Sequence, residues 1–327
     1  MTFSSRCVSN TQLCRVLAVV LAATVSACRE RAAPAPVTVR IGTGSPSGTL
    51  FALGKALAAA YSERIPDVQA SVKVIRGMEQ SVDAIERGDV DLAFDDSETA
   101  YVAFQRGTSA DPRPHAGLRA VAVLFPTVVQ VAARRDANIR SIKDLRGKRI
   151  EVSGPYDSSI EQAARIVLES YGLDYHSVTP VFGSATAADS LRRGDIDAVI
   201  LFVPLQYWLM REIADTVDVR LIPIEHDKIA AIQDRNHFLK STAIPAGTYR
   251  GQDEDVLTLG EDILLVCRQN LAEGLVFALT KTLFEASEDL VRAHPAASAI
   301  DPERGPTGSI PLHPGAARYY RDRQLPK

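Results

Sequence analysis

The feature that most constrains the fold is a repeated segment. Residues 87–94 read RGDVDLAF, and residues 193–200 read RGDIDAVI. Each copy follows an amphipathic segment typical of a helix, and each continues into apolar residues typical of a buried strand. Gly88 and Gly194 stand where the helix ends, a position that favours glycine because the chain turns there in the left-handed conformation. The chain therefore contains the same helix–turn–strand unit twice.

The residues before the two copies extend the repeat. Strand-like segments at 37–42 and 148–153 are each followed by a loop, a helix-like segment and a second strand-like segment. Each half is thus predicted to be a β–loop–α–β–α–turn–β unit with a parallel sheet. We expect an α/β fold with two Rossmann-like lobes that face each other across a central cleft. A cell-adhesion signal is the less favoured interpretation of Arg-Gly-Asp, because both copies lie at a helix–strand junction.

The lobes are predicted to be joined by two strand crossovers. These are placed at residues 119–135, where two strands are expected to meet at Pro126, and at residues 257–268. The predicted parts of the chain are a signal peptide at 1–27, a tether at 28–36, a first lobe at 37–126 and 263–327, and a second lobe at 127–262.

The N-terminus predicts export. Arg6 and Arg15 are the only charged residues before position 28, and an apolar run at 16–25 follows them. The run is shorter than the roughly 20 residues that span a bilayer. Residues 25–28, VSAC, resemble a bacterial lipobox, which implies cleavage before Cys28, a lipid on its sulfur and a place in the cell envelope. An ordinary cleavable signal with an incidental cysteine is the alternative.

Composition and cysteine usage narrow the class of protein. The 327 residues are 46% hydrophobic and 24% charged, values that are ordinary for a soluble globular chain. The formal net charge of −3 argues against a nucleic-acid partner. Cleavage and acylation of Cys28 would leave Cys267 without a disulfide partner. Cys267 lies in an apolar run, where we expect a buried thiol.

Two loops are candidates for ligand binding. Residues 42–48 read GTGSPSG and residues 154–159 read GPYDSS, and each loop precedes a helix-like segment. Ligands of parallel sheets bind at the carboxyl ends of strands, and helix N-termini attract anions. We therefore expect a small acid between the lobes, although a turn without a ligand is an alternative. A dinucleotide site is disfavoured because Ser47 displaces the third glycine. The predicted ligand contacts are Ser45, Ser47, Gly48, Thr49, Ser97, Ser158 and Ser159.

The two repeats differ in the residues that come after their strands. Asp95, Asp96 and Glu98 come after the first, and residues 202–210, FVPLQYWLM, come after the second. Clustered like charges favour a cation, which could be a ligand ammonium, Ca²⁺ or Mg²⁺, or nearby Arg and Lys. A solvated surface cluster is the alternative for the acids, and core packing is the alternative for the aromatic residues. The residues proposed for the cleft wall are Phe51, Asp96, Glu98, Pro204, Tyr207 and Trp208.

Motifs for catalysis are missing from the sequence. It contains no HExxH, GxSxG or CxxC pattern, and its histidines are scattered without metal-ligand spacing. A site assembled in space stays open, but a protein without enzymatic activity is favoured. No cofactor is predicted, and structural Ca²⁺ is left open.

Several segments together resemble the TAXI family, the extracytoplasmic solute receptors of TRAP transporters. The resemblance covers residues 37–323 and implies the type II periplasmic binding-protein fold. It also implies capture of a small organic acid or amino acid, lobe closure around it and docking on a membrane permease. The segments that carry the resemblance are 42–57, 87–94, 144–155, 244–260 and 310–322.

Three loops depart from the family pattern. Where the family typically has Gly-Thr-Tyr-Tyr-Pro, this chain has GTLFA at 48–52. Where the family favours Gln-Ser-Asp, this chain has Asp-Ser-Glu at 96–98, and the family's Gly-Ser-Gly-Thr is replaced by DSSI at 157–160. An acid in the last loop repels a ligand carboxylate, so these departures open the site to a more cationic or a differently shaped solute. A sensory lipoprotein that presents its ligand to a signalling partner is an alternative function, and an enzyme on the same fold is another.

Overall fold

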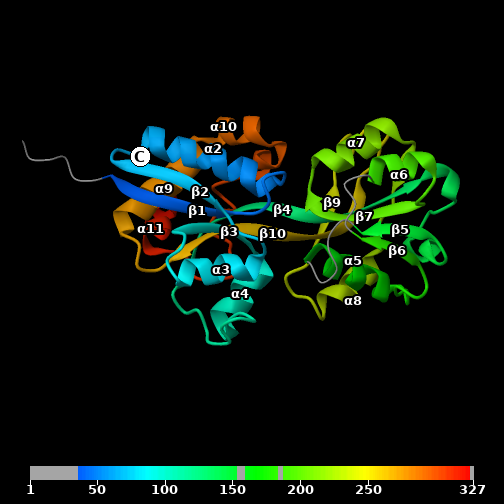
Figure 1. Cartoon of the computed structure of the whole chain (residues 1–327), viewed down its shortest axis with the longest axis horizontal. Coiled ribbons are helices and arrows are strands. Elements are labelled where there is room, and N and C mark those ends of the chain that lie inside the picture. Colours follow the sequence, from blue (N-terminus) through cyan, green and yellow to red (C-terminus); the bar gives the residue numbers. More distant parts are fainter. Residues whose placement is uncertain (1–35, 153–158, 183–186, 325–327) are drawn as a thin grey trace, which may run out of the picture. The chain divides into compact units, whose positions relative to one another are not determined.

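The computed structural model describes residues 36–152, 159–182 and 187–324 (Figure 1). The predicted signal peptide, Cys28 and all of the tether except Pro36 lie outside the described residues. In the described part, no helix is long and apolar enough to cross a membrane. Helices and strands alternate along most of the chain, so the predicted α/β class is confirmed.

The elements fall into three groups, which are the two lobes and the strands that cross between them. The first lobe contains β1 (Val37–Thr43), α2 (Thr49–Arg64), β2 (Val68–Val74), α3 (Met78–Glu86), β3 (Leu92–Asp96), α4 (Ser97–Arg106), α9 (Glu273–Glu285), α10 (Ser287–Ala293), the 3-10 helix η3 (Pro295–Ala299) and α11 (Pro314–Gln324). The second contains η1 (Arg135–Ala137), η2 (Ile142–Leu145), β5 (Arg149–Val152), α5 (Ser159–Ser170), β6 (Thr179–Phe182), α6 (Ala187–Arg193), β7 (Ala198–Pro204), α7 (Trp208–Thr216), β8 (Val219–Leu221), α8 (His226–Gln233) and β9 (Lys240–Ile244). The crossing strands are β4 (Leu118–Arg134) and β10 (Val256–Arg268).

The sheet topology confirms the internal repeat. The strand order is β2-β1-β3-β10-β4-β7-β5-β6, with β8 beside β4 and β9 beside β10. The order β2-β1-β3-β10 in the first lobe therefore matches β6-β5-β7-β4 in the second. In both, the first three strands are parallel and the crossing strand is antiparallel to its neighbour. The repeated glycines have positive φ, 71° at Gly88 and 76° at Gly194, as predicted for the turn.

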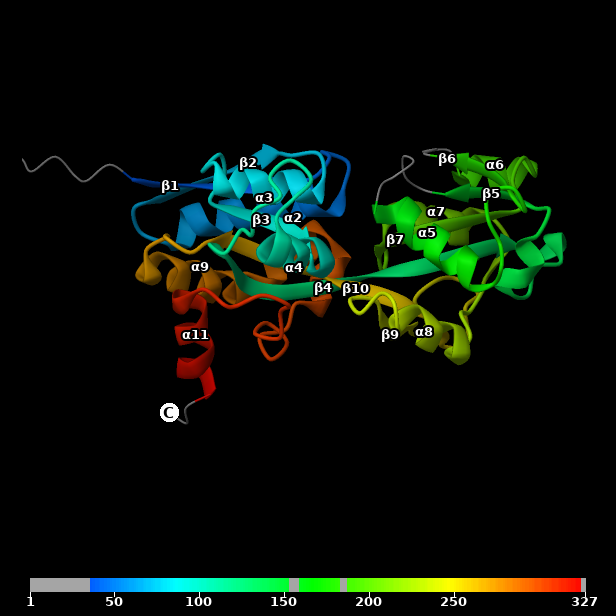
Figure 2. The same cartoon turned by 90° about the horizontal axis from the view of Figure 1, so that it is seen from below.

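Strands β4 and β10 run through both lobes and pair with each other along the way (Figure 2). The expectation that two strands meet at Pro126 is wrong, because β4 is one strand from Leu118 to Arg134. A proline is tolerated there because its fixed φ suits extended backbone. Pro126 lies opposite Asp262, and the β4–β10 register shifts between Ile263 and Leu264.

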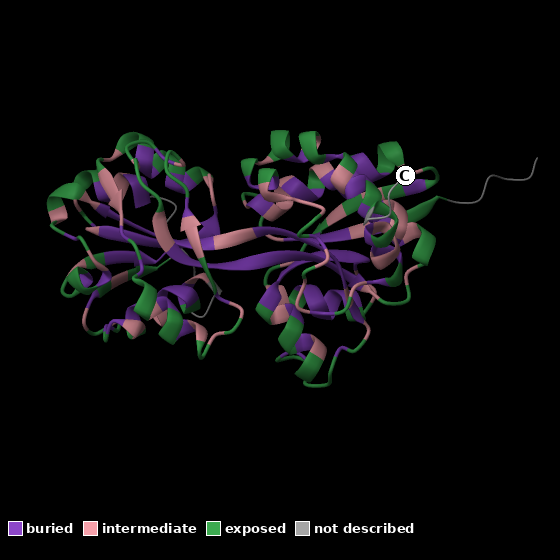
Figure 3. Ribbon diagram, turned by 180° about the vertical axis from the view of Figure 1, so that it is seen from behind, coloured by how far each residue is buried: buried purple, intermediate pink, exposed green. Residues whose placement is uncertain are grey.

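Helices cover both faces of the sheet in each lobe (Figure 1). In the first lobe, α2, α9, α10 and α11 pack on one face, and α3 and α4 pack on the other. In the second lobe, α5 and α8 cover one face and α6 and α7 the other. Figure 3 shows the buried residues on the inner sides of these helices and along the crossing strands.

The buried apolar residues fall into two groups along the chain. The clusters of the first lobe draw on residues 39–125 and 263–320. Those of the second draw on residues 128–259 only. We propose that the lobes divide near Pro126 and Asp262, as the sequence predicts, and these two groups support that division. Cys267 is a buried free thiol, as expected, and burial raises its pKa.

Candidate functional site

A cavity of about 580 Å³ is lined by both lobes. The first lobe supplies residues that follow β1 and β2, the end of β3 and parts of α3 and α4. The second lobe supplies residues of α5, Phe202 near the end of β7 and Leu239, while Glu261 comes from the crossing strand β10. Much of this lining lies at the carboxyl ends of parallel strands, where ligands of open α/β sheets bind.

A smaller cavity of about 190 Å³ adjoins the first. The two share Leu50, Met78, Asp96 and Phe202 in their linings. The remaining lining of the smaller cavity is mostly apolar, with Thr49 and Thr127 as further polar residues, and it includes Pro204 and Tyr207. Together the cavities form a site with an acidic side and an apolar end.

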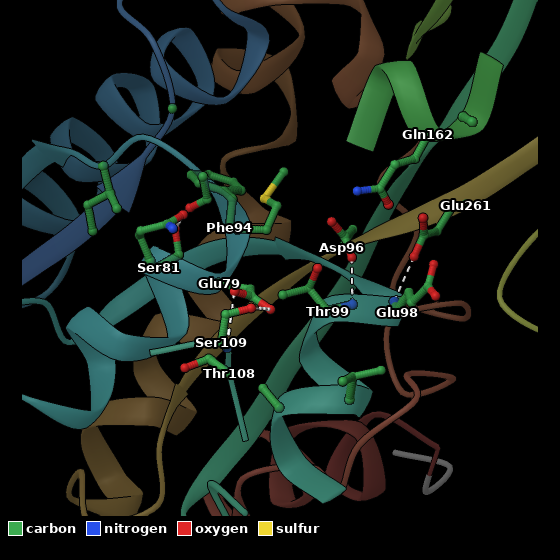
Figure 4. A pocket seen from close by; sticks show the side chains of 18 of the residues that line it. Glu79, Ser81, Phe94, Asp96, Glu98, Thr99, Thr108, Ser109, Gln162 and Glu261 are labelled. Atoms are coloured by element: carbon green, nitrogen blue, oxygen red, sulfur yellow. Dashed lines mark hydrogen bonds between the residues drawn. The ribbon is translucent and has the colours of Figure 1, made fainter. Parts of the chain in front are cut away.

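The acidic side is built around the N-terminus of α4. Asp96 ends β3 and caps this helix, because its Oδ1 accepts a hydrogen bond of 2.7 Å from the Thr99 N–H. Glu261 reaches the same helix end from β10, where its Oε1 accepts a hydrogen bond of 2.6 Å from the Glu98 N–H. The two carboxylates thus satisfy two of the free N–H groups that begin a helix. Figure 4 shows Asp96 and Glu261 converging on one space, with Gln162 of α5 opposite.

Burial shifts the pKa values of this cluster upward. Burial and then the neighbouring Asp96 and Glu98 raise the pKa of Glu261 to about 9. Burial, followed by the charge of Asp96, raises the pKa of Asp95 well above its ordinary value. The pKa values of Asp96 and Glu98 are also raised, in both cases chiefly by burial. Among the described residues, no positively charged neighbour contributes to any of these shifts.

Some of the residues predicted for the site line the cavities. Asp96 and Glu98, proposed for the cleft wall, face the larger cavity, and Pro204 and Tyr207 face the smaller one. Thr49 also lines the smaller cavity. Its hydroxyl lies 3.3 Å from Nε2 of His294, and burial lowers the pKa of this histidine.

Other predicted residues lie elsewhere. The hydroxyls of Ser45 and Ser47 are exposed and 3.2 Å apart, and Gly48 is the N-cap residue that precedes α2. The Ser97 hydroxyl is buried and donates to the carbonyl of Asp262 at 2.9 Å. The further residues outside both linings are Phe51, which is half-buried, and Trp208, which is exposed.

The second-lobe loop of the predicted contacts is not described in full. Ser158 lies outside the described residues, and only the backbone of Ser159 lies within them, as the start of α5. Ligand contact by the serines and glycine of the two loops therefore stays a prediction.

Sequence reasoning missed Glu261, Gln162 and Glu79. One signal could have revealed Glu261: it stands beside Asp262 inside an otherwise apolar strand. Gln162 and Glu79 lie on helices whose exposed positions are commonly polar, so their sequence carries no such signal.

A metal site is not apparent in the described part of the chain. Within residues 36–152, 159–182 and 187–324, no group of three or more His, Cys, Asp or Glu side chains is placed to hold a metal ion. The structure therefore adds no support to the Ca²⁺ site that the sequence left open.

The lobes, their paired crossing strands and the cavity between them define a two-lobed fold of the type II periplasmic binding-protein class. Residues 41–323 match the model of the NMT1-like family, and the chain belongs to this family.

Solved structures with similar folds share little sequence with this chain. XAC2383 from Xanthomonas citri, bound to ATP, is 14% identical, with a TM-score of 0.51 and coverage of 87% of this chain and 94% of that one. The periplasmic aliphatic sulphonate binding protein SsuA from Escherichia coli is 16% identical, with a TM-score of 0.47 and coverage of 89% of both chains. At these identities the likeness concerns the fold alone.

Proposed function

We propose that this protein is an extracytoplasmic solute-binding receptor that captures a small organic solute between its lobes and delivers it to a membrane transporter. The observation that carries this proposal is the cavity of about 580 Å³, which takes its lining from both lobes and from β10. Solute sites are commonly concave, partly apolar and supplied with a few polar groups. The lining of this cavity has that composition, and the sequence adds no catalytic motif to it.

Binding would be coupled to lobe closure. A solute that contacts α4 of the first lobe and α5 of the second stabilises the arrangement in which both walls reach it. The strands β4 and β10 connect the lobes, and their register shift near Ile263 is a suitable place for a hinge. A transporter could then distinguish the loaded receptor from the empty one by the relative placement of its lobes.

The transporter is proposed to be of the TRAP type, on the strength of the resemblance to TAXI receptors. A lipid on Cys28 would hold the receptor near such a permease. Labelling of cells with a palmitate analogue tests the anchor: the wild type should incorporate the label and the Cys28→Ser variant should not. Labelling that is equal in both proteins would contradict lipidation at this residue.

Receptor function is tested by thermal unfolding of the purified protein with a library of amino acids, organic acids and amines. A bound solute present at about 100 times its Kd should stabilise the folded state by roughly 2.7 kcal/mol. Small-angle X-ray scattering should then show a smaller radius of gyration with the stabilising solute. Stabilisation accompanied by chemical turnover of the solute would favour an enzyme instead.

A further inference from the structure

The larger cavity is acidic, and the described residues that line it supply no counter-charge. Among the described residues that line it, none is Lys, Arg or His. The internal segments outside the described residues, 153–158 and 183–186, contain no such residue in their sequences either. The carboxylates that line the cavity are Glu79, Asp96, Glu98 and Glu261.

Glu261 has an acceptor left over for a ligand. The residue is only 5% exposed, and its Oε1 is used by the Glu98 N–H. No residue in the described ranges donates a hydrogen bond to its Oε2, and the side chain points into the cavity (Figure 4). Oδ2 of Asp95 in β3, a fully buried residue outside both linings, is also without a hydrogen-bond partner among the described residues. The free oxygen of Glu261 can therefore accept a hydrogen bond from a ligand that supplies N–H groups, and a charge-assisted bond of this kind is stronger than a neutral one.

Two buried carboxylates outside the cavity lining do have counter-ions. Asp262 follows Glu261 in β10 and pairs with Lys240 at 2.6 Å and with Arg304 at 2.9 Å. Asp91, before β3, pairs with Arg40 and Arg268. The described acids that line the cavity thus lack the counter-ions that Asp91 and Asp262 have.

The rest of the cavity lining suits an organic molecule better than a hydrated metal ion. Apolar side chains of Met78, Phe94, Ile166 and Phe202 line the same cavity, and they suit a hydrocarbon body. A metal ion would need several polar ligands around it, and the described residues place no suitable trio of His, Cys, Asp or Glu.

We propose that the cavity binds a small organic amine with a net positive charge, whose nitrogen lies between Glu261 and Asp96 and whose hydrocarbon part packs on Met78 and Phe202. This inference rests on the proposed receptor function and names its solute class. It replaces the expectation of an organic acid, because a ligand carboxylate would meet four acidic side chains and no basic group among the described lining residues.

The inference is tested by thermal unfolding of the full chain at pH 8 with single probes. The probes are 1,5-diaminopentane, agmatine and choline as amines, glutarate and glutamate as acids, and CaCl₂ alone. At least one amine should raise the melting temperature, and the acids and Ca²⁺ should not. Stabilisation by the acids but not by the amines would overturn the solute class and leave the receptor function standing. Stabilisation by Ca²⁺ without any amine effect would overturn it in favour of a metal. No effect of any probe would overturn the proposed solute class, whereas the receptor function is judged by the wider library described above.

Two substitutions test whether Glu261 and Asp96 bind the amine. Glu261→Gln keeps the side-chain shape but cannot ionise. A bound cation favours the ionised form of a neighbouring carboxyl, so titration calorimetry should show at least about a tenfold weaker amine affinity for the variant. Asp96→Asn, which can still cap α4, is the second variant and should weaken the amine similarly. Glu288→Gln, at a side chain that is 92% exposed on α10, is the matched control and should change nothing. Equal affinity in all three variants would refute the assigned contact.

Discussion

The carboxylate of Asp91 accepts three hydrogen bonds from Arg40: from its backbone N–H at 2.9 Å, its Nε at 3.0 Å and its Nη2 at 3.3 Å. Asp197 accepts the same three from Arg149, at 2.9, 3.1 and 2.6 Å. The last Asp of each repeated Arg-Gly-Asp-x-Asp segment thus ties the start of its strand to the neighbouring strand. This shared anchor gives the repeat a structural explanation.

The anchors should contribute unequally to stability. The side chain of Asp91 is 5% exposed and also binds Arg268, whereas that of Asp197 is 16% exposed. Asp91→Asn should lower the free energy of unfolding by about 2–3 kcal/mol and Asp197→Asn by less, because the more buried charge pair loses more. Urea denaturation measures both. Asp189→Asn, which breaks the exposed pair with Arg192 on α6, should cost less than about 1 kcal/mol. A larger loss in Asp197→Asn than in Asp91→Asn would contradict this order.

Glu261 should make the protein less stable as the pH rises. Its pKa is about 9 in the folded state against an ordinary 4.5, so between these values the folded state binds more protons than the unfolded state. The free energy of unfolding therefore falls across this window, by up to about 1.4 kcal/mol per pH unit for one group. Its charged neighbours are Asp96, Glu98 and Asp262, and Asp262 is paired with Lys240 and Arg304.

The Glu261→Gln variant isolates this contribution. It should be more stable than the wild type at pH 8 and nearly equal to it at pH 4.5, since Asp95 and Asp96 are retained in both. Guanidinium unfolding at several pH values provides the measurement. A difference that does not change with pH would show that the carboxyl of Glu261 does not titrate as described.

An aromatic contact links the lobes at the edge of the cavity. The rings of Tyr101 in α4 and Phe238, which precedes β9, have centroids 5.1 Å apart. Tyr101→Ala should remove about 0.5–1.5 kcal/mol of interlobe attraction, and so increase the radius of gyration in X-ray scattering. Tyr319→Ala is the control, because its stacked partner Phe284 lies in the same lobe. It should lower stability without changing the radius of gyration. An equal radius in the wild type and both variants would show that the Tyr101–Phe238 contact does not hold the lobes together.

The repeated glycines should resist substitution. Gly88→Ala and Gly194→Ala place a side chain at φ values of 71° and 76°, which costs about 1–2 kcal/mol. Gly194→Ala should cost more, because the added Cβ would press on Nη1 of Arg134. Gly274→Ala in α9, where a Cβ meets no atom within 4 Å, should cost nothing. Thermal unfolding measures all three, and an unchanged melting temperature in the first two would contradict the strained turn.

The fold could be predicted from the sequence because short local patterns determine its helices, turns and strands. The two repeats, the helix-ending glycines and the apolar strands lie within short windows, and they fix the order of elements in each lobe. Asp96 and Glu98 were found because they follow a predicted strand directly. Glu261 was not, because it meets α4 only through the register that pairs Ile263 of β10 with Asp96 of β3. The prediction of a strand break at Pro126 was wrong for a related reason. Whether a proline interrupts a strand depends on how that strand pairs with its neighbour, and the pairing cannot be seen in one segment of the sequence.

The core of the first lobe is built from two separate parts of the chain, and this affects the order in which the lobes can fold during synthesis. Its apolar residues lie at 39–125 and 263–320, so that core cannot be completed before residue 320 has been synthesised. The core of the second lobe draws on the continuous stretch 128–259 and has no such requirement. We therefore expect the middle of the chain to fold first, while the N-terminal third, although translated earlier, waits for α9 and α11 to cover its sheet.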